Sequence, residues 1–246
     1  MPKGFLAVLS EPGQVPIDEF HDWYNNEHIP LRLDHLPAFL TGARYTARDG
    51  KKPSWIALYD IDSVSTFADP SYTRLRENRS PREAALVKRL DVLDRRTCEV
   101  ISESENKRSV TEALSTGLAL GNPAQWIFTH GVDTNTEEGG DAKKTIAEAW
   151  RTMAEIGRRV TGLHRSRLFE CTDSLKTGVT ISTAPEEQKV ARYLVLHELT
   201  SKDAFGNLRA GLQELADNNR LTISEEREWS IYRAYPCIAQ GNVNSS

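Results

Sequence analysis

Residues 17–45 read IDEFHDWYNNEHIPLRLDHLPAFLTGARY and hold three of the chain's six histidines. Pro16 and the acidic residues that follow it favour a helix beginning at Ile17, because proline fits the first turn and carboxylates suit a helix N-terminus. Pro30 disfavours helical geometry at the residue before it. We therefore expect the helix to end near His28.

One side of this predicted helix combines apolar and titratable residues. At 100° per residue, one face of the helix holds Ile17, His21, Tyr24 and His28. The two histidines thus lie at the margin of the apolar face, where a side chain can reach a cavity. Most histidines on a helix edge have no chemical role, so position alone does not assign one.

The segment also resembles the first helix and second strand of EthD-type members of the dimeric α/β-barrel family. The residues that carry the resemblance are Trp23-Tyr24, His28-Ile29-Pro30-Leu31, Leu36-Pro37, Gly42 and Tyr45. In that family the histidine of the His-x-Pro-Leu segment points into the barrel cavity. The resemblance therefore implies a small-molecule enzyme and favours His28.

Composition is ordinary for a soluble globular protein, with 246 residues, 39% hydrophobic and 27% charged. The length allows one large domain or two of about 100 residues. No apolar run approaches the ~20 residues needed to cross a bilayer, and the N-terminus reads as a strand rather than a secretory signal. We therefore expect no membrane partner.

The net charge of −4, without a basic stripe, argues against nucleic acid as a partner. The three cysteines, Cys98, Cys171 and Cys237, are widely spaced and odd in number. A reduced thiol set in a cytoplasmic protein is the simplest interpretation.

The pattern of strands and helices occurs twice. Strands are predicted at 4–9, 41–47, 54–61 and 97–101, with helices at 17–28, 64–76 and 80–93. This βαββαβ order is the ferredoxin-like arrangement. After a linker the order returns, with strands at 125–129, 162–169, 190–199 and 228–235, and helices at 141–160 and 205–215.

The repeat is also visible in the amino-acid sequence itself. Ile56-Ala57-Leu58-Tyr59-Asp60-Ile61 aligns with Leu194-Val195-Leu196-His197-Glu198-Leu199. We assign an N-terminal unit at 1–105, a linker at 106–120 with a helical turn near 110–114, and a C-terminal unit at 121–240. The second unit carries an insertion at 172–189.

The fold class is therefore α+β, with two tandem ferredoxin-like units whose antiparallel sheets pack as an α/β barrel. A ferredoxin-like sheet leaves one apolar face bare, and that face must be covered. Either the barrel closes within a monomer or two chains pair as a homodimer.

Strand alternation places Ile56, Leu58, Leu194 and Leu196 on an aliphatic face suited to packing under helices. The opposite face combines aromatic and polar side chains, which suits a pocket for a hydrophobic or aromatic small molecule. The predicted substrate-binding residues are Trp55, Trp126, His130, Tyr193 and His197. The alternative is that they are ordinary core aromatics.

No histidine–carboxylate or cysteine cluster has metal-ligand spacing, and no nucleotide-binding glycine motif or Gly-x-Ser-x-Gly elbow is present. We therefore expect no metal and no cofactor. What remains is acid–base chemistry by histidine and tyrosine. The predicted catalytic residues are His28, Tyr59, His21 and Tyr24.

These residues suffice for a cofactor-independent lyase or isomerase of secondary metabolism, acting by cyclisation, decarboxylation or dehydration on an aromatic or polyketide-like metabolite. Two alternatives stay open. One is a non-catalytic small-molecule binding protein, and the other is a monooxygenase, because that activity occurs on the same fold.

Overall fold

Eight antiparallel strands close into one barrel within a single chain, in the order β1-β3-β2-β8-β5-β7-β6-β4. The computed structural model describes residues 1–105, 117–135, 140–218 and 221–241. The strands are β1 (Gly4–Glu11), β2 (Ala43–Ala47), β3 (Trp55–Ile61), β4 (Val92–Glu105), β5 (Trp126–Thr134), β6 (Leu163–Thr177), β7 (Tyr193–Leu199) and β8 (Leu221–Ala234). The predicted α+β class and the barrel are confirmed.

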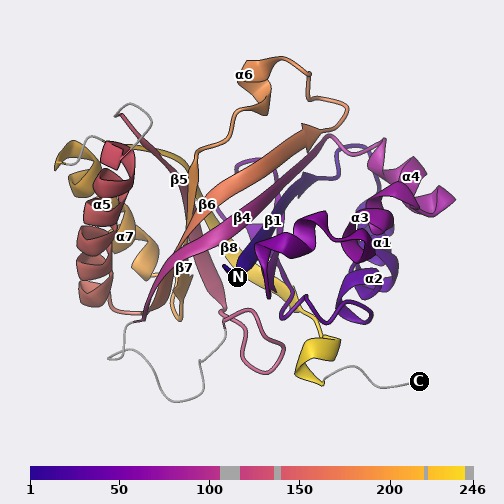
Figure 1. Ribbon diagram of the computed structural model, residues 1–246, viewed down its shortest axis with the longest axis horizontal. Helices are drawn as coiled ribbons and strands as arrows, with labels where there is room; N and C mark the ends of the chain where they lie inside the picture. The colour runs from indigo at the N-terminus through magenta and orange to yellow at the C-terminus, as the bar shows by residue number, and fades with distance from the viewer. Residues whose placement is uncertain (106–116, 136–139, 219–220, 242–246) are drawn as a thin grey trace.

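Helices cover two opposite sides of the barrel, with α1 to α4 on one side and α5 and α7 on the other (Figure 1). The helical segments are α1 (Ile17–Trp23), the π-helix η1 (Tyr24–His28), α2 (Pro30–Leu33), the 3-10 helix η2 (Val64–Ala68), α3 (Pro70–Glu77), α4 (Pro81–Val87), α5 (Gly140–Arg159), α6 (Pro185–Gln188), α7 (Ala204–Asn218) and the 3-10 helix η3 (Ile238–Gln240).

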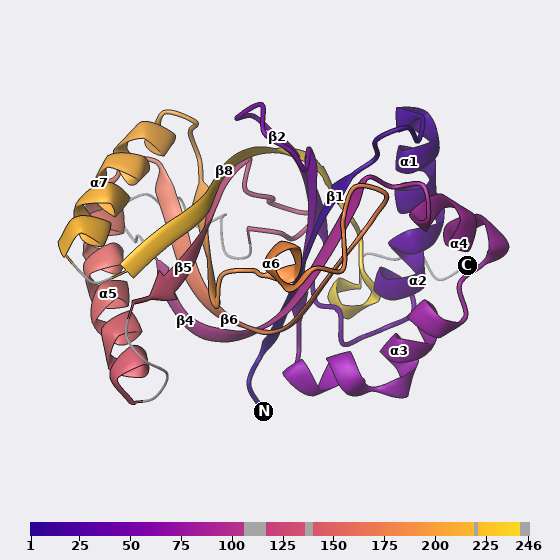
Figure 2. The same ribbon diagram turned by 90° about the horizontal axis from the view of Figure 1, so that it is seen from above.

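The halves meet along two seams, β2 against β8 and β4 against β6. Looking along the barrel, the strands of both halves form one ring, and α6 lies over its opening (Figure 2). The domain boundaries assigned from the repeat remain our proposal.

The two faces of the sheet are the reverse of those predicted. Ile56, Leu58, Leu194 and Leu196 fill the barrel interior together with Phe5, Tyr45 and Trp229. Tyr59 and Tyr193 instead pack beneath the helices of their own halves. The interior of an eight-stranded barrel is just wide enough for side chains to fill, and here aliphatic and aromatic residues fill it together.

The helical run does not end at His28. Ile29 has helical dihedral angles, and its N–H donates to the carbonyl of Tyr24 at 3.1 Å, five residues back. The chain continues as α2 to Leu33. One extra residue in the turn lets the ladder avoid the proline clash that we expected to stop it.

Other element boundaries also differ from those predicted. The helix predicted at 80–93 ends at Val87. The strand before the insertion is longer than predicted, whereas the strand after it begins only at Tyr193. β6 runs to Thr177, so the start of the predicted insertion is strand paired with β4. The helical turn predicted near 110–114 lies outside the described residues.

The segment 117–124 closes the barrel end opposite α6. Leu118 is fully buried in the barrel interior, and the Tyr45 hydroxyl donates to the carbonyl of Ala124 at 3.0 Å. Gly117 has φ +48°, and a Cβ there would lie 1.8 Å from an oxygen of Glu198. Only glycine allows this approach.

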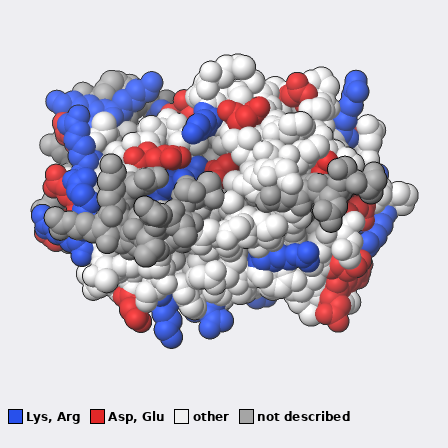
Figure 3. All heavy atoms as spheres, turned by 90° about the horizontal axis from the view of Figure 1, so that it is seen from below, with Lys and Arg blue, Asp and Glu red and all other residues white. Residues whose placement is uncertain are grey.

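No helix in the described part of the chain is both long enough and apolar enough to cross a membrane. On the face shown in Figure 3, basic and acidic side chains are interspersed rather than gathered by sign.

Candidate functional site

The predicted site residues separate into two groups on opposite sides of the barrel. His21, Tyr24, His28, Trp55 and Tyr59 belong to the N-terminal half, in or beside the layer between its sheet and helices. In the C-terminal half, the corresponding layer holds Trp126, His130, Tyr193 and His197. The two groups therefore do not share one cavity, and the catalytic and binding roles given to these residues stay predictions.

In the N-terminal half, His28 is paired with a carboxylate. Its Nδ1 lies 2.7 Å from Oε1 of Glu83, which is 2% exposed in the side chain. Ser80 caps α4 by accepting the backbone N–H of Glu83 at 2.9 Å. The Glu83 side chain does not reach back to the cap as in a full capping box, and it bonds His28 instead.

The charge state of the pair is set by its surroundings. Burial, then the nearby Arg32 cation, lowers the pKa of His28 to about 4. Burial alone would raise the pKa of Glu83, but the hydrogen bond with His28 lowers it. Near neutral pH an ionised carboxylate therefore accepts from Nδ1–H of a neutral imidazole.

This arrangement leaves the second ring nitrogen as the basic atom. Nε2 of His28 has no hydrogen-bond partner among the described residues, and the side chain is 14% exposed. A histidine whose Nδ1 is fixed by a carboxylate presents Nε2 to a reacting proton. Sequence reasoning found His28 but missed Glu83, although Ser80-Pro81-Arg82-Glu83 has the capping-box pattern.

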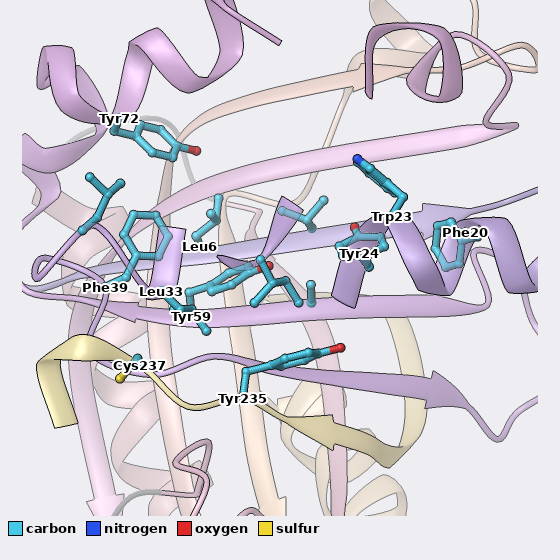
Figure 4. Close-up of a cluster of buried hydrophobic side chains, with 14 of the residues drawn as sticks. Leu6, Phe20, Trp23, Tyr24, Leu33, Phe39, Tyr59, Tyr72, Tyr235 and Cys237 are labelled. Atoms are coloured by element: carbon cyan, nitrogen blue, oxygen red, sulfur yellow. The ribbon is translucent and has the colours of Figure 1, made fainter. Parts of the chain in front are cut away.

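Two polar groups in the same layer lack partners. The Trp23 indole N–H and the Tyr59 hydroxyl are buried without a hydrogen bond to any described residue. The Tyr24 hydroxyl has one long contact, 3.5 Å to Oγ of Ser10. Figure 4 shows these side chains between the helices and the strands. Because buried polar groups are normally paired, unpartnered donors mark a place that could receive a polar ligand atom.

Arg44 of β2 lies beside this group and is 1% exposed. Its guanidinium carbon stands 4.0 Å from the ring centre of Tyr24, and it has no carboxylate partner among the described residues. Three further rings surround it at 5.0 to 5.2 Å, those of Phe20, Trp55 and Tyr232. A positive charge held mainly by aromatic rings raises the potential of this layer.

Arg44 also fixes the state of His21. Its Nη2 lies 3.2 Å from Nδ1 of His21, and an arginine only donates, so Nδ1 accepts and the proton sits on Nε2. Burial, then Arg44, lowers the pKa of His21 to about 4. With its Nδ1 lone pair engaged, His21 is poorly placed to act as a base.

In the C-terminal half, three buried polar side chains form a chain. His130 and His197 face each other through their Nε2 atoms at 3.1 Å, and Nδ1 of His197 lies 2.7 Å from Oγ of Ser166. All three are at most 1% exposed. Burial lowers the pKa of His130 to about 4 and lowers that of His197 well below its usual value.

The buried series of His130, His197 and Ser166 predicts that the free energy of unfolding depends on pH. Because unfolded histidine has a pKa of about 6.5, the unfolded state binds more protons between that value and the folded pKa of about 4. Stability therefore falls as pH drops through this window. The shifted pKa of His130 alone should lower the free energy of unfolding by roughly 2 kcal/mol between about pH 7 and pH 5.

The free energy of unfolding in urea at the two pH values measures this effect. The difference in the free energy of unfolding between the two pH values should be smaller in His130→Phe. Carboxylates titrate mostly below this pH range, so they contribute little to the difference. Equal pH dependence in the two proteins would contradict the assignment.

The barrel has a cavity at each end. The cavity at the α6 end, of about 460 Å³, is lined by aliphatic residues such as Leu9 and Ile56 and by an ion-pair cluster. In that cluster, Arg96 binds Asp94 and Glu225. Of the predicted site residues, only His130 contributes to this lining.

The cavity at the Gly117 end has a volume of about 440 Å³ and includes Asp60, Arg165 and Arg167 in its lining. Sequence reasoning missed these interior charges. Their alternate spacing within strands, as in Arg165-x-Arg167, was the available signal. Across the described residues, no group of three or more histidines, cysteines or carboxylates could hold a metal ion.

Comparisons with known proteins identify the fold. No family model matches the chain, and no curated protein matches it either. Among solved structures, an anthrone oxidase-like protein matches with a TM-score of 0.60 and 9% identity, over 100% of this chain and 96% of that one.

A candidate chlorite dismutase matches with a TM-score of 0.54 and 12% identity, over 95% of this chain and 96% of the other. A candidate monooxygenase from Fusobacterium nucleatum matches with a TM-score of 0.54 and 8% identity, over 96% and 94%. At these identities the likeness shows the dimeric α/β-barrel fold alone, and membership of the EthD-type branch stays a prediction.

Proposed function

We propose that the protein is a cofactor-independent enzyme that removes a proton from an aromatic or polyketide-like small molecule, with His28 as the general base. The proposal depends above all on the contact of 2.7 Å between Nδ1 of His28 and Glu83. This contact, together with the lowered pKa, leaves a neutral imidazole whose Nε2 can accept a proton.

The neighbouring side chains supply what the resulting anion needs. Glu83 stabilises the imidazolium that forms on proton transfer. Burial raises the pKa of Tyr59, so its hydroxyl stays protonated and can donate to an enolate or phenolate oxygen. The Trp23 N–H is a second unpartnered donor, and Arg44 contributes positive potential.

The fate of the carbanion decides the reaction class. Return of the proton at another carbon is isomerisation, loss of carbon dioxide is decarboxylation, and attack on a carbonyl of the same molecule is cyclisation. Attack on molecular oxygen would be the monooxygenase reaction. Two structural neighbours are described as anthrone oxidase-like and as a candidate monooxygenase, so we carry this reaction beside the lyase and isomerase reactions.

The facing histidines of the C-terminal half do not offer their Nε2 atoms to a haem iron. One structural neighbour, from Thermus thermophilus, is described as heme-binding. Here His130 and His197 direct their Nε2 atoms at each other, and both are fully buried beside a packed aromatic and aliphatic layer. The two facing Nε2 atoms are engaged with each other, whereas Nδ1 of His130 and both ring nitrogens of His164 are buried without a partner among the described residues. No step is assigned to haem.

Anthrone is a suitable first probe because its methylene protons are acidified by a conjugated ketone. In D₂O without oxygen, the protein should accelerate exchange of these protons for deuterium, measured by NMR or mass. Under air, an oxygenase would also form anthraquinone and water from anthrone and O₂, at the expense of one O₂ per molecule.

Exchange at the buffer rate, together with tight anthrone binding, would support the non-catalytic binding protein instead. Exchange without oxygen uptake would favour the lyase or isomerase class.

A further inference from the structure

Two cysteines that are far apart in sequence meet at the seam between the halves. Cys98 of β4 is the direct cross-strand partner of Cys171 of β6, and their Sγ atoms lie 3.4 Å apart. Directly opposed residues in an antiparallel pair have Cα atoms about 4.5–5.5 Å apart. That spacing lies inside the range of about 4.4–6.8 Å that a disulfide spans.

A bulge in the seam creates this pairing. Thr97 pairs with Asp173, so an unbroken register would set Cys98 against Thr172. The register shifts by one residue at this point, and Thr172 is left to donate its hydroxyl to the carbonyl of Thr97 at 3.0 Å. Because a one-residue slip changes which side chains oppose each other, the extra residue is what brings the two thiols together.

The two sulfurs differ in their surroundings. Cys98 is fully buried in the barrel interior, whereas Cys171 is partly exposed. The hydrogen bond between them lowers the pKa of Cys171 and raises that of Cys98, and the Arg96 cation favours the thiolate. Cys171 is therefore the more nucleophilic sulfur and the one that an oxidant can reach.

We propose that Cys98 and Cys171 are a redox-active dithiol that hydroperoxides oxidise to a disulfide across the β4–β6 seam. The Cys171 thiolate attacks one peroxide oxygen and becomes a sulfenic acid, while the other oxygen leaves as water or an alcohol. The Cys98 sulfur then attacks the sulfenic sulfur, forms the S–S bond and releases water. Two thiols are oxidised and one hydroperoxide is reduced.

The product would join the two halves covalently. β4 belongs to the first half and β6 to the second, and 73 positions separate the two cysteines. A cross-link that closes so long a loop restricts the unfolded chain, so the oxidised protein should melt at a higher temperature than the reduced one.

Hydrogen peroxide added to the reduced full-length protein tests this directly. After denaturation and alkylation, the expected product carries one alkyl group, on Cys237, and has lost two hydrogen atoms. Peptide mapping should show Cys98 joined to Cys171. Cys237→Ser is the matched control and should keep the cross-link, whereas Cys171→Ser should lose it.

The wild-type map decides the question even if a variant fails to fold. Full alkylation of all three cysteines after peroxide would overturn the proposal. So would a bridge that includes Cys237, or a sulfinic acid on Cys171 without any cross-link.

Discussion

Replacing His28 by alanine should lower kcat/KM for anthrone deuterium exchange by about 10²–10⁴-fold, the usual contribution of a positioned general base. The imidazole Nε2 is the proton acceptor in this account, and no other described group in the layer is a neutral base with a free lone pair. Affinity for anthrone should change little, because Tyr24, Tyr59 and Trp23 remain.

His35→Ala is the matched control, since His35 is exposed and lies in the same segment. It should leave the exchange rate unchanged. Glu83→Gln should reduce the rate less than His28→Ala, because it removes the carboxylate but keeps the imidazole. A His28→Ala protein that exchanges anthrone normally, or that loses only affinity, would exclude His28 as the base.

Replacing Glu198 by alanine should lower the free energy of unfolding by about 3–5 kcal/mol, the usual cost of breaking a buried ion pair. Glu198 is fully buried and accepts Nε and Nη2 of Arg165 at 3.1 and 2.7 Å. Without it the Arg165 cation stays buried and loses both of these hydrogen bonds. At roughly 2–4 °C per kcal/mol, the melting temperature should fall by about 10 °C.

Glu155→Ala provides the control, because Glu155 is 59% exposed and lies 4.0 Å from an equally exposed Arg158. Its effect should stay within about 0.5 kcal/mol. Urea unfolding of both variants measures the contrast. If the two variants have equal stability, the barrel interior does not depend on this ion pair.

The order of the elements could be predicted because it depends on local patterns. The repeated letters at 56–61 and 194–199 revealed two copies of one unit, and the bare apolar sheet faces required a barrel. The choice of face could not be predicted from alternation. Both faces of β3 and β7 are apolar enough to be buried, so alternation alone does not tell that Leu58 lies inside the barrel and Tyr59 beneath the helices.

The candidate site was predictable only in part. His28 and Tyr24 followed from a motif, whereas alternation placed Tyr59 on the barrel face and the structure places it beneath the helices. Glu83 and Arg44 depend on tertiary contacts, since one comes from a later helix and the other from a strand. The pairing of Cys98 with Cys171 depends on a bulge of one residue, which no sequence spacing encodes.

In the proposed site Glu83 holds the proton of His28 on Nδ1, while burial and Arg32 keep the imidazole neutral. A pH titration of ¹⁵N-labelled histidine by NMR measures both the tautomer and the pKa without any substrate. The expected result is an Nδ1–H tautomer at neutral pH that titrates near the lowered pKa of about 4, and loss of that tautomer preference in Glu83→Gln. An Nε2–H tautomer, or a titration near the ordinary value of about 6.5, would contradict the account.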